Sequence, residues 1–323
     1  MSARILRSTA ELASLPRGGV VSIGNFDGVH RAHQAVLAQV IAAARAAGGP
    51  AVAITLDPHP VRLLRPAAAP RLITPLAEKL HLLAATGLDA IAVLPFTREL
   101  SQLTPRQFTA SVLVGGLAPA TVHEGANFQF GHRHAGTVAT LAALGAEFGF
   151  DVVVHPEMQW RGQPVSSSRV RELLAAGDVS RAARLLARWF SVRGAIAAGH
   201  GVGRRLTVPT LNLAPYPELL PARGVYVTQT RLGDRWWPSV SNCGLRPTFA
   251  PAGDPDVLTV ETHLLGFGPA AAPDLPEEME IRFLWRLREE RKFPAPEALK
   301  AQILLDAARA GRFLRRLPPR ALQ

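Results

Sequence analysis

A change of pattern near residue 190 most constrains the fold of this chain of 323 residues. Before it, short apolar runs alternate with runs whose apolar residues recur at helical spacing. After it, strand-like runs follow one another across turn residues such as Gly233-Asp234, and one helical run, residues 296–314, comes last. The first pattern predicts a parallel sheet covered by helices on both faces, and the second predicts a small antiparallel barrel with a C-terminal helix. We therefore expect two domains, residues 1–188 and 189–323.

The elements expected in the first domain place its ligand site. The strands are predicted at residues 19–24, 51–56, 89–96, 120–125 and 151–156. Long helices are predicted at 32–47 and 137–149, and Gly177 and Asp178 divide 166–190 into two short helices as a stop and an N-cap. Parallel sheets of this kind bind ligands outside the carboxyl ends of their strands, beside helix N-termini.

Composition indicates a globular chain, with 48% hydrophobic and 19% charged residues. A single cysteine, Cys243, excludes an intrachain disulfide, suits a reducing compartment, and is expected to pack inside the barrel rather than to react. The N-terminal residues lack the apolar core of a secretory signal, and no apolar run reaches the ~18 residues of a membrane span. We expect a cytoplasmic protein without a membrane partner.

The formal net charge of +11 favours anionic partners such as nucleotides or nucleic acid. Arginines are spread along the chain, without a long Lys/Arg block and with few interleaved aromatic residues. A nucleic-acid-binding protein is therefore only a remote alternative, which tight and salt-dependent binding to RNA or DNA would reveal.

The stretch SIGNFDGVHRAHQAVL, from Ser22 to Leu37, carries two histidines at the start of a helix. At a spacing of three, His30 and His33 share one face, and Asp27-Gly28 lets the chain bend into the helix. The helix N-terminus adds unbonded N–H groups and the positive end of its dipole, so the imidazoles could stabilise charge on a phosphate. A pair of solvated histidines is the alternative, and their spacing alone does not choose between the two.

The residues around this pair resemble a known family. GNFDGVHRAHQ (24–34) resembles the GxFDGxHxGHQ stretch of the prokaryotic bifunctional riboflavin kinase/FAD synthetases. Further along, ITLDPHP (54–60), EGANFQFGHRHAG (124–136) and VSSSRVRELLAAGDVSRAARLLAR (165–188) resemble the next motifs of the same family in the same order. The resemblance implies a Rossmann-like nucleotidyltransferase domain that transfers AMP from ATP to FMN.

The resemblance also implies site residues in this domain. His30 and His33 would contact ATP phosphates as the catalytic pair. The rest of the ATP site would comprise Asn25, Phe26, Gly28, Ser166, Ser167 and Arg169. The flavin side would comprise His59, Asn127 and Phe128, with Phe130 beside them; for the two phenylalanines, strand core is an equal alternative. Two departures, Ala32 for glycine and Ser168 for threonine, keep the helix and the hydroxyl, so we expect an active site.

A second candidate site begins at GHGVGRRLTVPTLNL (199–213). Its alternating glycines allow the backbone to approach phosphates and its arginines supply charge, although a flexible barrel loop is the alternative. The PTLN residues that follow include a hydroxyl and an amide, which are neutral oxygen donors suited to Mg²⁺ beside a nucleotide.

This half resembles the riboflavin kinase module of the same family. The resemblance is carried by GRRLTVPTLNL, RGVYVT, SNCGLRPTF, VETHLLGF and FLWRLREERKFPAPEALKAQILLD. By position, Gly203, Arg204, Thr210 and Asn212 would bind ATP, the last two also holding Mg²⁺. Glu261 would be the general base for the terminal ribityl hydroxyl of riboflavin, a solvated strand glutamate being the alternative.

The departures in this half lie in loops, at Thr207-Val208, Gly266 and residues 274–277, and leave the metal and base positions in place. We therefore expect a two-step enzyme that uses ATP and Mg²⁺ to convert riboflavin to FMN in the barrel and FMN to FAD in the first domain. The alternative is an FMN adenylyltransferase with an inactive barrel, which would make FAD from FMN but no FMN from riboflavin. The sequence does not set an oligomeric state.

Overall fold

The chain divides into two compact units, Met1–Ser167 and Ser168–Gln323. Its structure, a computed structural model, describes residues 3–197, 210–245, 258–267, 275–291 and 293–318. The division falls after the first residue of α8 (Ser167–Ala175). This helix and α9 (Val179–Leu186) are the two short helices expected on either side of Gly177 and Asp178. The expected domain boundary at residue 188 stays a prediction. No helix in the described ranges is long and apolar enough to cross a membrane.

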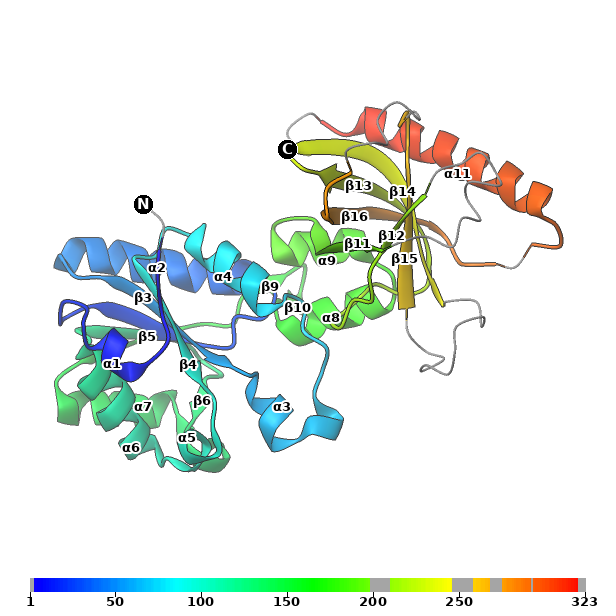
Figure 1. Ribbon diagram of the computed structural model, residues 1–323. Coiled ribbons are helices and arrows are strands. Elements are labelled where there is room, and N and C mark those ends of the chain that lie inside the picture. Colours follow the sequence, from blue (N-terminus) through cyan, green and yellow to red (C-terminus); the bar gives the residue numbers. More distant parts are fainter. Residues whose placement is uncertain (1–2, 198–209, 246–257, 268–274, 292, 319–323) are drawn as a thin grey trace. The chain divides into compact units, whose positions relative to one another are not determined.

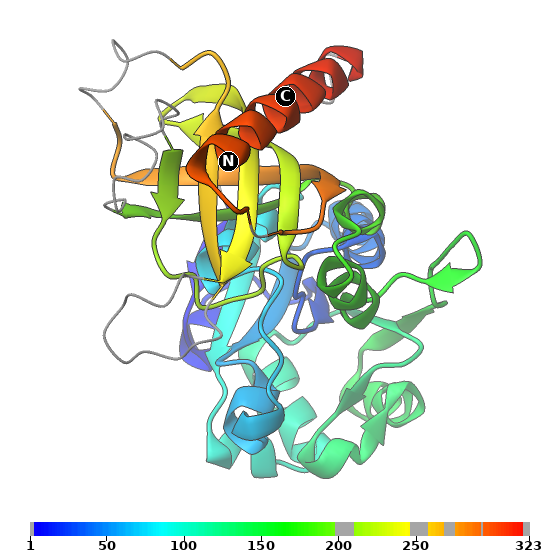
Figure 2. The same cartoon turned by 90° about the vertical axis from the view of Figure 1, so that its right-hand side faces the viewer.

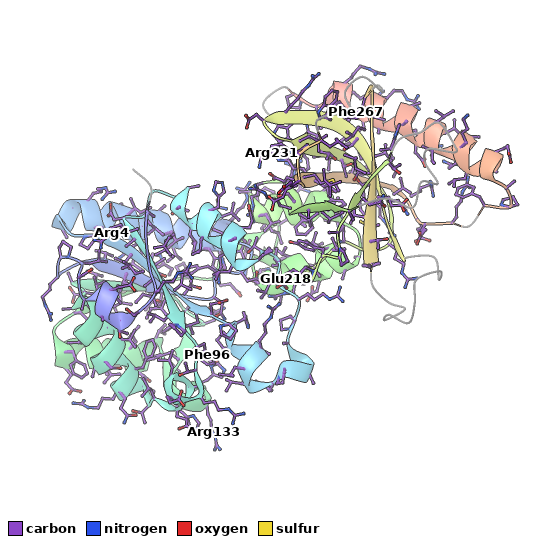
Figure 3. The ribbon with its side chains drawn as sticks, viewed as in Figure 1. Arg4, Phe96, Arg133, Glu218, Arg231 and Phe267 are labelled. Carbon is purple, nitrogen blue, oxygen red and sulfur yellow. The ribbon has the colours of Figure 1, made fainter. Side chains whose placement is uncertain are left out.

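The first unit is built on a six-stranded parallel sheet in the order β1-β4-β3-β2-β5-β8 (Figure 1). The strands are β1 (Arg4–Leu6), β2 (Val20–Ile23), β3 (Ala51–Asp57), β4 (Ala90–Pro95), β5 (Thr121–Gly125) and β8 (Asp151–His155). The expected parallel sheet and its five predicted strands are confirmed. The additional strand β1, which begins at Arg4 (Figure 3), is too short to show a sequence period and forms by pairing with β4.

Helices cover both faces of this sheet, as the alternating pattern predicts. On one face α2 (Arg31–Ala47) and α4 (Leu76–Ala84) bury Leu37, Val40 and Leu83 against the strands. The other face is covered by α1 (Thr9–Leu12), the π-helix η2 (Thr109–Leu117) and α7 (Val138–Phe148). The two long helices predicted from periodicity, α2 and α7, each end at a glycine in the left-handed region, Gly48 and Gly149.

Short elements complete this unit. They are α3 (Pro60–Leu64), η1 (Pro66–Ala68), α5 (Arg98–Gln102), α6 (Pro105–Phe108), β6 (Gln129–Phe130), η3 (His132–His134), β7 (Gly136–Thr137), β9 (Gln159–Trp160) and β10 (Gln163–Pro164).

The strand order reverses direction between β2 and β5. From β2 the chain adds β3 and then β4 on one side, and it later returns to add β5 and β8 on the other side. The loops that leave the carboxyl ends of β2 and β5 therefore run to opposite sides of the sheet, which opens a ligand-binding crevice in folds of this kind. This edge of the sheet is where the first candidate site should lie.

The second unit contains a closed antiparallel barrel in the order β11-β12-β15-β14-β13-β16, with a long helix across it (Figure 2). The elements are β11 (Phe190–Ala197), β12 (Thr210–Leu213), β13 (Gly224–Leu232), β14 (Arg235–Leu245), β15 (Leu258–Leu264), β16 (Glu278–Arg288) and α11 (Pro296–Arg316). Pairing of β11 with β16 closes the sheet and removes its edges. The predicted barrel, its Gly233-Asp234 turn and the buried Cys243 are confirmed.

A buried ion pair fastens α11 to the barrel. The Asp306 carboxylate is almost fully buried and accepts bonds from Arg288 Nε at 2.9 Å and Gln302 Nε2 at 2.8 Å. Around it, Ala310 and Leu314 of α11 pack with Val227 of the barrel. Removing the carboxylate would leave the partly buried guanidinium of Arg288 without this partner, which is costly.

We therefore expect Asp306→Ala to lower the free energy of unfolding by about 3–5 kcal/mol, the usual cost of breaking a buried ion pair. Glu278→Ala is the matched control, because its ion pair with Arg193 is more than half exposed on both sides and such pairs contribute at most ~1 kcal/mol. The measurement is urea unfolding of the full chain, followed by circular dichroism and tryptophan fluorescence. Equal, small losses in both variants would contradict this assignment.

Candidate functional site

The turn that connects β2 to α2 has an unusual backbone. Phe26 and Val29 adopt φ angles of 47° and 39°, and Gly28 between them has a φ of 83°. Left-handed backbone is unfavourable for a side chain branched at Cβ such as valine, and residues held this way cost on the order of 1–3 kcal/mol each. Such a turn persists only where its surroundings hold it.

Asp27 fixes this turn by hydrogen bonds to a distant segment of the chain. Its carboxylate accepts the backbone N–H of Ile73 at 3.0 Å and of Thr74 at 3.1 Å, while the Gly28 N–H donates to Thr74 Oγ1 at 3.1 Å. The Ser167 hydroxyl donates to the Asp27 carbonyl at 2.8 Å. The sequence predicted Asp27 only as a turn residue, because its partners lie 46 or more positions away.

His30 and His33 lie together at the start of α2, as their spacing predicts. Their rings stack with centroids 3.6 Å apart and an angle of 17°, and the edge of Phe26 meets His33 at 5.2 Å. His30 is the N-cap residue, but its side chain does not cap the helix, and the first turn contains no acidic residue. The first amides of α2 and its dipole therefore favour a bound anion here.

The electrostatic surroundings hold His33 in its neutral form. Burial lowers its pKa well below the ordinary value of 6.5, and the nearby His30 and Lys79 lower it further. Within the described residues, His33 Nδ1 is buried and has no hydrogen-bond partner. A neutral imidazole offers one N–H donor and one acceptor nitrogen. Near neutral pH this ring can therefore donate a hydrogen bond to a phosphate oxygen without carrying a positive charge.

A carboxyl that sequence reasoning missed lies on β5, next to the end of β2. Glu124 is 3% exposed, and its Oε1 accepts the Ile23 N–H at 2.6 Å. Burial raises its pKa well above 4.5 and outweighs the opposite effect of this bond. The folded chain therefore favours the protonated form of Glu124 more than it would at an exposed glutamate. The sequence marks Glu124 only as the first residue of the EGANFQFGHRHAG stretch, at the end of a strand that also contains the polar residues Thr121 and His123.

The residues predicted on the flavin side follow β3 and β5 at the same edge of the sheet. His59 caps α3 through a bond from the Val61 N–H to its Nδ1 at 3.3 Å, and Asn127 is exposed in the turn after β5. Phe130 is buried in the core, which favours the core alternative for that ring. Phe128 is half-buried and stacks on Phe130 with centroids 5.4 Å apart, so one side of it packs on the core.

Of the predicted ATP-site residues in the serine-rich segment, Ser167 contacts the turn between β2 and α2. Ser167 contacts Asp27, as described above, and Ser166 precedes it and is half-buried. Arg169 lies in α8 of the second unit, where it forms an ion pair with Glu172 at 2.7 Å.

In the barrel, strand register brings together polar residues from three strands. Asn212 of β12 and Asn242 of β14 are both paired with Glu261 of β15, one on each side. Glu261 is exposed while its neighbours Val260 and Thr262 are buried, as the alternation predicted. The three paired residues therefore share the outer face of the barrel. The predicted Gly203 and Arg204 lie outside the described residues.

The donor set on this face fits a hard cation. Thr210 and Asn212 are two positions apart on β12, so their hydroxyl and amide oxygens point to the side that also carries Glu261. Neutral oxygens with one carboxylate are ligands that Mg²⁺ accepts beside phosphates. Asn242 also donates to Glu290 Oε1 at 3.4 Å. Sequence reasoning gave these last two residues no role, although both lie in segments that resemble the kinase module.

Comparisons with known proteins cover both units. The FAD synthetase family matches residues 12–169, and the riboflavin kinase family matches residues 186–314. A bifunctional riboflavin kinase/FMN adenylyltransferase of Pseudomonas fluorescens is 35% identical over 308 residues, covering 95% of this chain and 96% of that protein. One from Escherichia coli K12 is 33% identical over 313 residues, covering 96% and 97%.

Among solved structures, one titled a macrolide-efflux protein from Streptococcus pneumoniae has a TM-score of 0.83. It is 24% identical and covers 98% of this chain and 100% of its own. At that identity the likeness extends to the fold alone.

The buried Glu124 predicts a pH dependence of stability. Because its pKa in the folded chain is raised, the folded state binds this proton more tightly than the unfolded state. Its contribution is complete below pH 4.5 and is lost as pH rises toward the folded pKa, by up to ~1.4 kcal/mol per pH unit. Glu124→Gln, which stays neutral, should remove this decline and be more stable than the wild type at alkaline pH. The control is Glu157→Gln, which changes an exposed carboxylate. The measurement is the free energy of unfolding of the wild type and both variants as a function of pH. Three parallel curves would contradict the assignment.

Proposed function

This chain belongs to the family of bifunctional riboflavin kinase/FMN adenylyltransferases, and we propose that each unit performs one of the two reactions with the residues assembled above. The barrel phosphorylates riboflavin with ATP to give FMN and ADP. The first unit joins FMN to the AMP portion of ATP, giving FAD and pyrophosphate. The observation that carries this conclusion is that the match to one bifunctional relative runs through both units of one chain.

In the first unit, an oxygen of the FMN phosphate attacks the α-phosphorus of ATP, and the bond to the β-phosphate breaks. No protein nucleophile is required, so catalysis depends on positioning and on stabilising the charge of the transition state. His30 and His33 would donate hydrogen bonds to the α-phosphate at the N-terminus of α2. The ATP pocket would be completed by Asn25, Phe26, Gly28, Ser166, Ser167 and Arg169, with the last three on the departing pyrophosphate.

FMN would bind beside the ends of β3 and β5. His59 and Asn127 follow these strands and would contact its polar groups. The half-buried face of Phe128 is suited to the flavin ring, whereas Phe130 beneath it supports that face from the core.

In the barrel, Glu261 would accept the proton of the terminal ribityl hydroxyl as that oxygen attacks the γ-phosphorus of ATP. Asn212 and Asn242 flank Glu261 on neighbouring strands and would fix its position. Thr210 and Asn212 would bind ATP and hold Mg²⁺, together with Gly203 and Arg204 on the nucleotide side. When bound, this ion neutralises phosphate charge.

The test of the function is incubation of the protein with riboflavin, ATP and Mg²⁺, with separation of flavins over time. FMN should form first and FAD should follow. Formation of neither product would contradict the function. Formation of FAD from added FMN, with no FMN from riboflavin, would establish the adenylyltransferase alone.

His33→Ala should lower the rate of FAD formation roughly 10²–10³-fold, the usual effect of removing one donor that stabilises transition-state charge. FMN formation in the same sample should continue, because the barrel is a separate unit. Gln39→Ala, an exposed change on the same helix, is the control. A folded His33→Ala variant that loses both activities together would show that the sites are not separate.

Glu261→Ala should have the opposite effect. Loss of a general base lowers the rate roughly 10²–10⁴-fold, so FMN formation should nearly stop while FAD still forms from added FMN. Glu297→Ala, which removes an exposed carboxylate from α11, is the control. Normal phosphorylation of riboflavin by Glu261→Ala would exclude Glu261 as the base.

A further inference from the structure

Lys79 of α4 is a buried cation that the reaction described above does not use. It is 6% exposed, and its Nζ donates to the Asn25 carbonyl and to Thr55 Oγ1, each at 3.1 Å. Within the described part of the chain, no carboxylate forms an ion pair with it, and two neutral oxygens accept its bonds. Lysine is almost never fully buried without a charged partner, because a desolvated charge is costly. Its position therefore needs an explanation beyond packing.

The ammonium group of Lys79 bonds to residues at the ends of two neighbouring strands, β2 and β3, at the candidate site. Asn25 follows β2, and Thr55 lies in the neighbouring strand β3. The Thr55 hydroxyl also reaches the Asn25 carbonyl, at 3.4 Å. Lys79 thus holds the first residue of the strained turn that leads to His30 and His33. Of these two donors to the Asn25 carbonyl, only Lys79 carries a charge.

The charged and titratable groups around Lys79 come from three elements. Asp27, in the turn after β2, and Asp57, at the end of β3, raise its pKa, while burial has the larger effect and lowers it. His33 of α2 lies within electrostatic reach and is in turn stacked on His30. The protein leaves this positive charge only partly neutralised at the place where ATP and FMN, both polyanions, would bind.

We propose that Lys79 is a positioning residue for AMP transfer, which fixes the turn at Asn25 that leads to the histidine pair and adds a buried positive charge to that turn. This inference rests on the proposed adenylyltransferase function of the first unit. Lys79 acts through Asn25 and His33 rather than on the reacting atoms. Charge-assisted hydrogen bonds of this kind are stronger than neutral ones and lose little to solvent when buried.

The test compares three variants of the full chain with the wild type. Lys79→Met removes the charge and the donors, Lys79→Arg keeps the charge, and His81→Gln changes an exposed residue of the same helix as the control. Lys79→Met should lower kcat/KM for FAD formation from FMN by at least about 10-fold, as expected for losing a hydrogen bond to a charged group. Lys79→Arg should recover part of this loss, and His81→Gln should match the wild type.

The pH profile separates positioning from a purely structural role. In the wild type, burial, then His30 and then Lys79 lower the pKa of His33. Lys79→Met removes the third cause, so the pKa of His33 rises and the acid limb of kcat for FAD formation should move to higher pH. In Lys79→Arg, where the charge remains, that limb should stay. Loss of folding stability alone would not move it.

FMN formation from riboflavin, measured in the same samples, reports whether the barrel of each variant is active, and urea unfolding followed by circular dichroism reports whether the first unit is folded. A folded Lys79→Met variant with the kcat/KM and acid limb of the wild type would overturn the inference. If Lys79→Met does not fold, Lys79→Gln, which keeps a donor without the charge, is measured instead and judged by the same two readouts. A wild-type chain that makes no FAD would contradict the proposed function itself, which is a different result.

Discussion

The carboxylate of Asp27 binds the turn after β2 to the segment before α4, and the geometry of the first site depends on these bonds. Without them, the left-handed backbone at Phe26 and Val29 could relax, because neither residue prefers it. With them, the chain enters α2 so that His30 is its N-cap and His33 lies one turn further on. The same bonds fix the start of α4, and so they determine where Lys79 reaches the end of β2.

Polar and charged groups are buried at this edge of the sheet, while the sheet's two faces are packed with apolar side chains. The apolar surroundings lower the local dielectric, which explains why the pKa of His33 is lowered and the pKa of Glu124 is raised. Buried groups with shifted pKa values are more frequent at functional sites than elsewhere. Here they lie where the strand order reverses, between β2 and β5, which is the place where such sheets bind ligands.

In the barrel, the proposed site is on the outer face, and the centre of the barrel has to be filled by side chains. The centre contains hydroxyls that bond to one another, with Thr228 bonded to Ser239 and Ser241, and Ser241 to Thr262, at 2.7–2.8 Å. These bonds satisfy buried polar groups and join three strands, β13, β14 and β15. A slip of one residue in the register of β15 would break these bonds and turn Glu261 toward the interior of the barrel. The bonds between the interior hydroxyls therefore also keep Glu261 on the outer face.

Local patterns in the sequence were sufficient for most of the fold. Alternating runs identified the sheet of the first unit and the strands of the barrel, because a period of two or of 3.6 depends only on neighbouring residues. Helix ends at Gly48, Gly149 and Asp178 and the Gly233-Asp234 turn followed from local backbone preferences. The sequence analysis did not predict the strand β1, because three residues are too few to show a period. It also did not predict the helix α4, whose contact with Asn25 through Lys79 is visible only in the folded chain.

The sequence by itself determined which residues start the helix at the proposed phosphate site and which strand carries Glu261, since both are short-range patterns within motifs that resemble one family. Only the tertiary structure decided that Asp27 holds Ile73 and Thr74, that Lys79 lies under Asn25, and that Asn212 and Asn242 flank Glu261. These contacts join residues from 19 to 54 positions apart. Chain crossover and strand register create them, and no local pattern encodes the register by which distant strands pair.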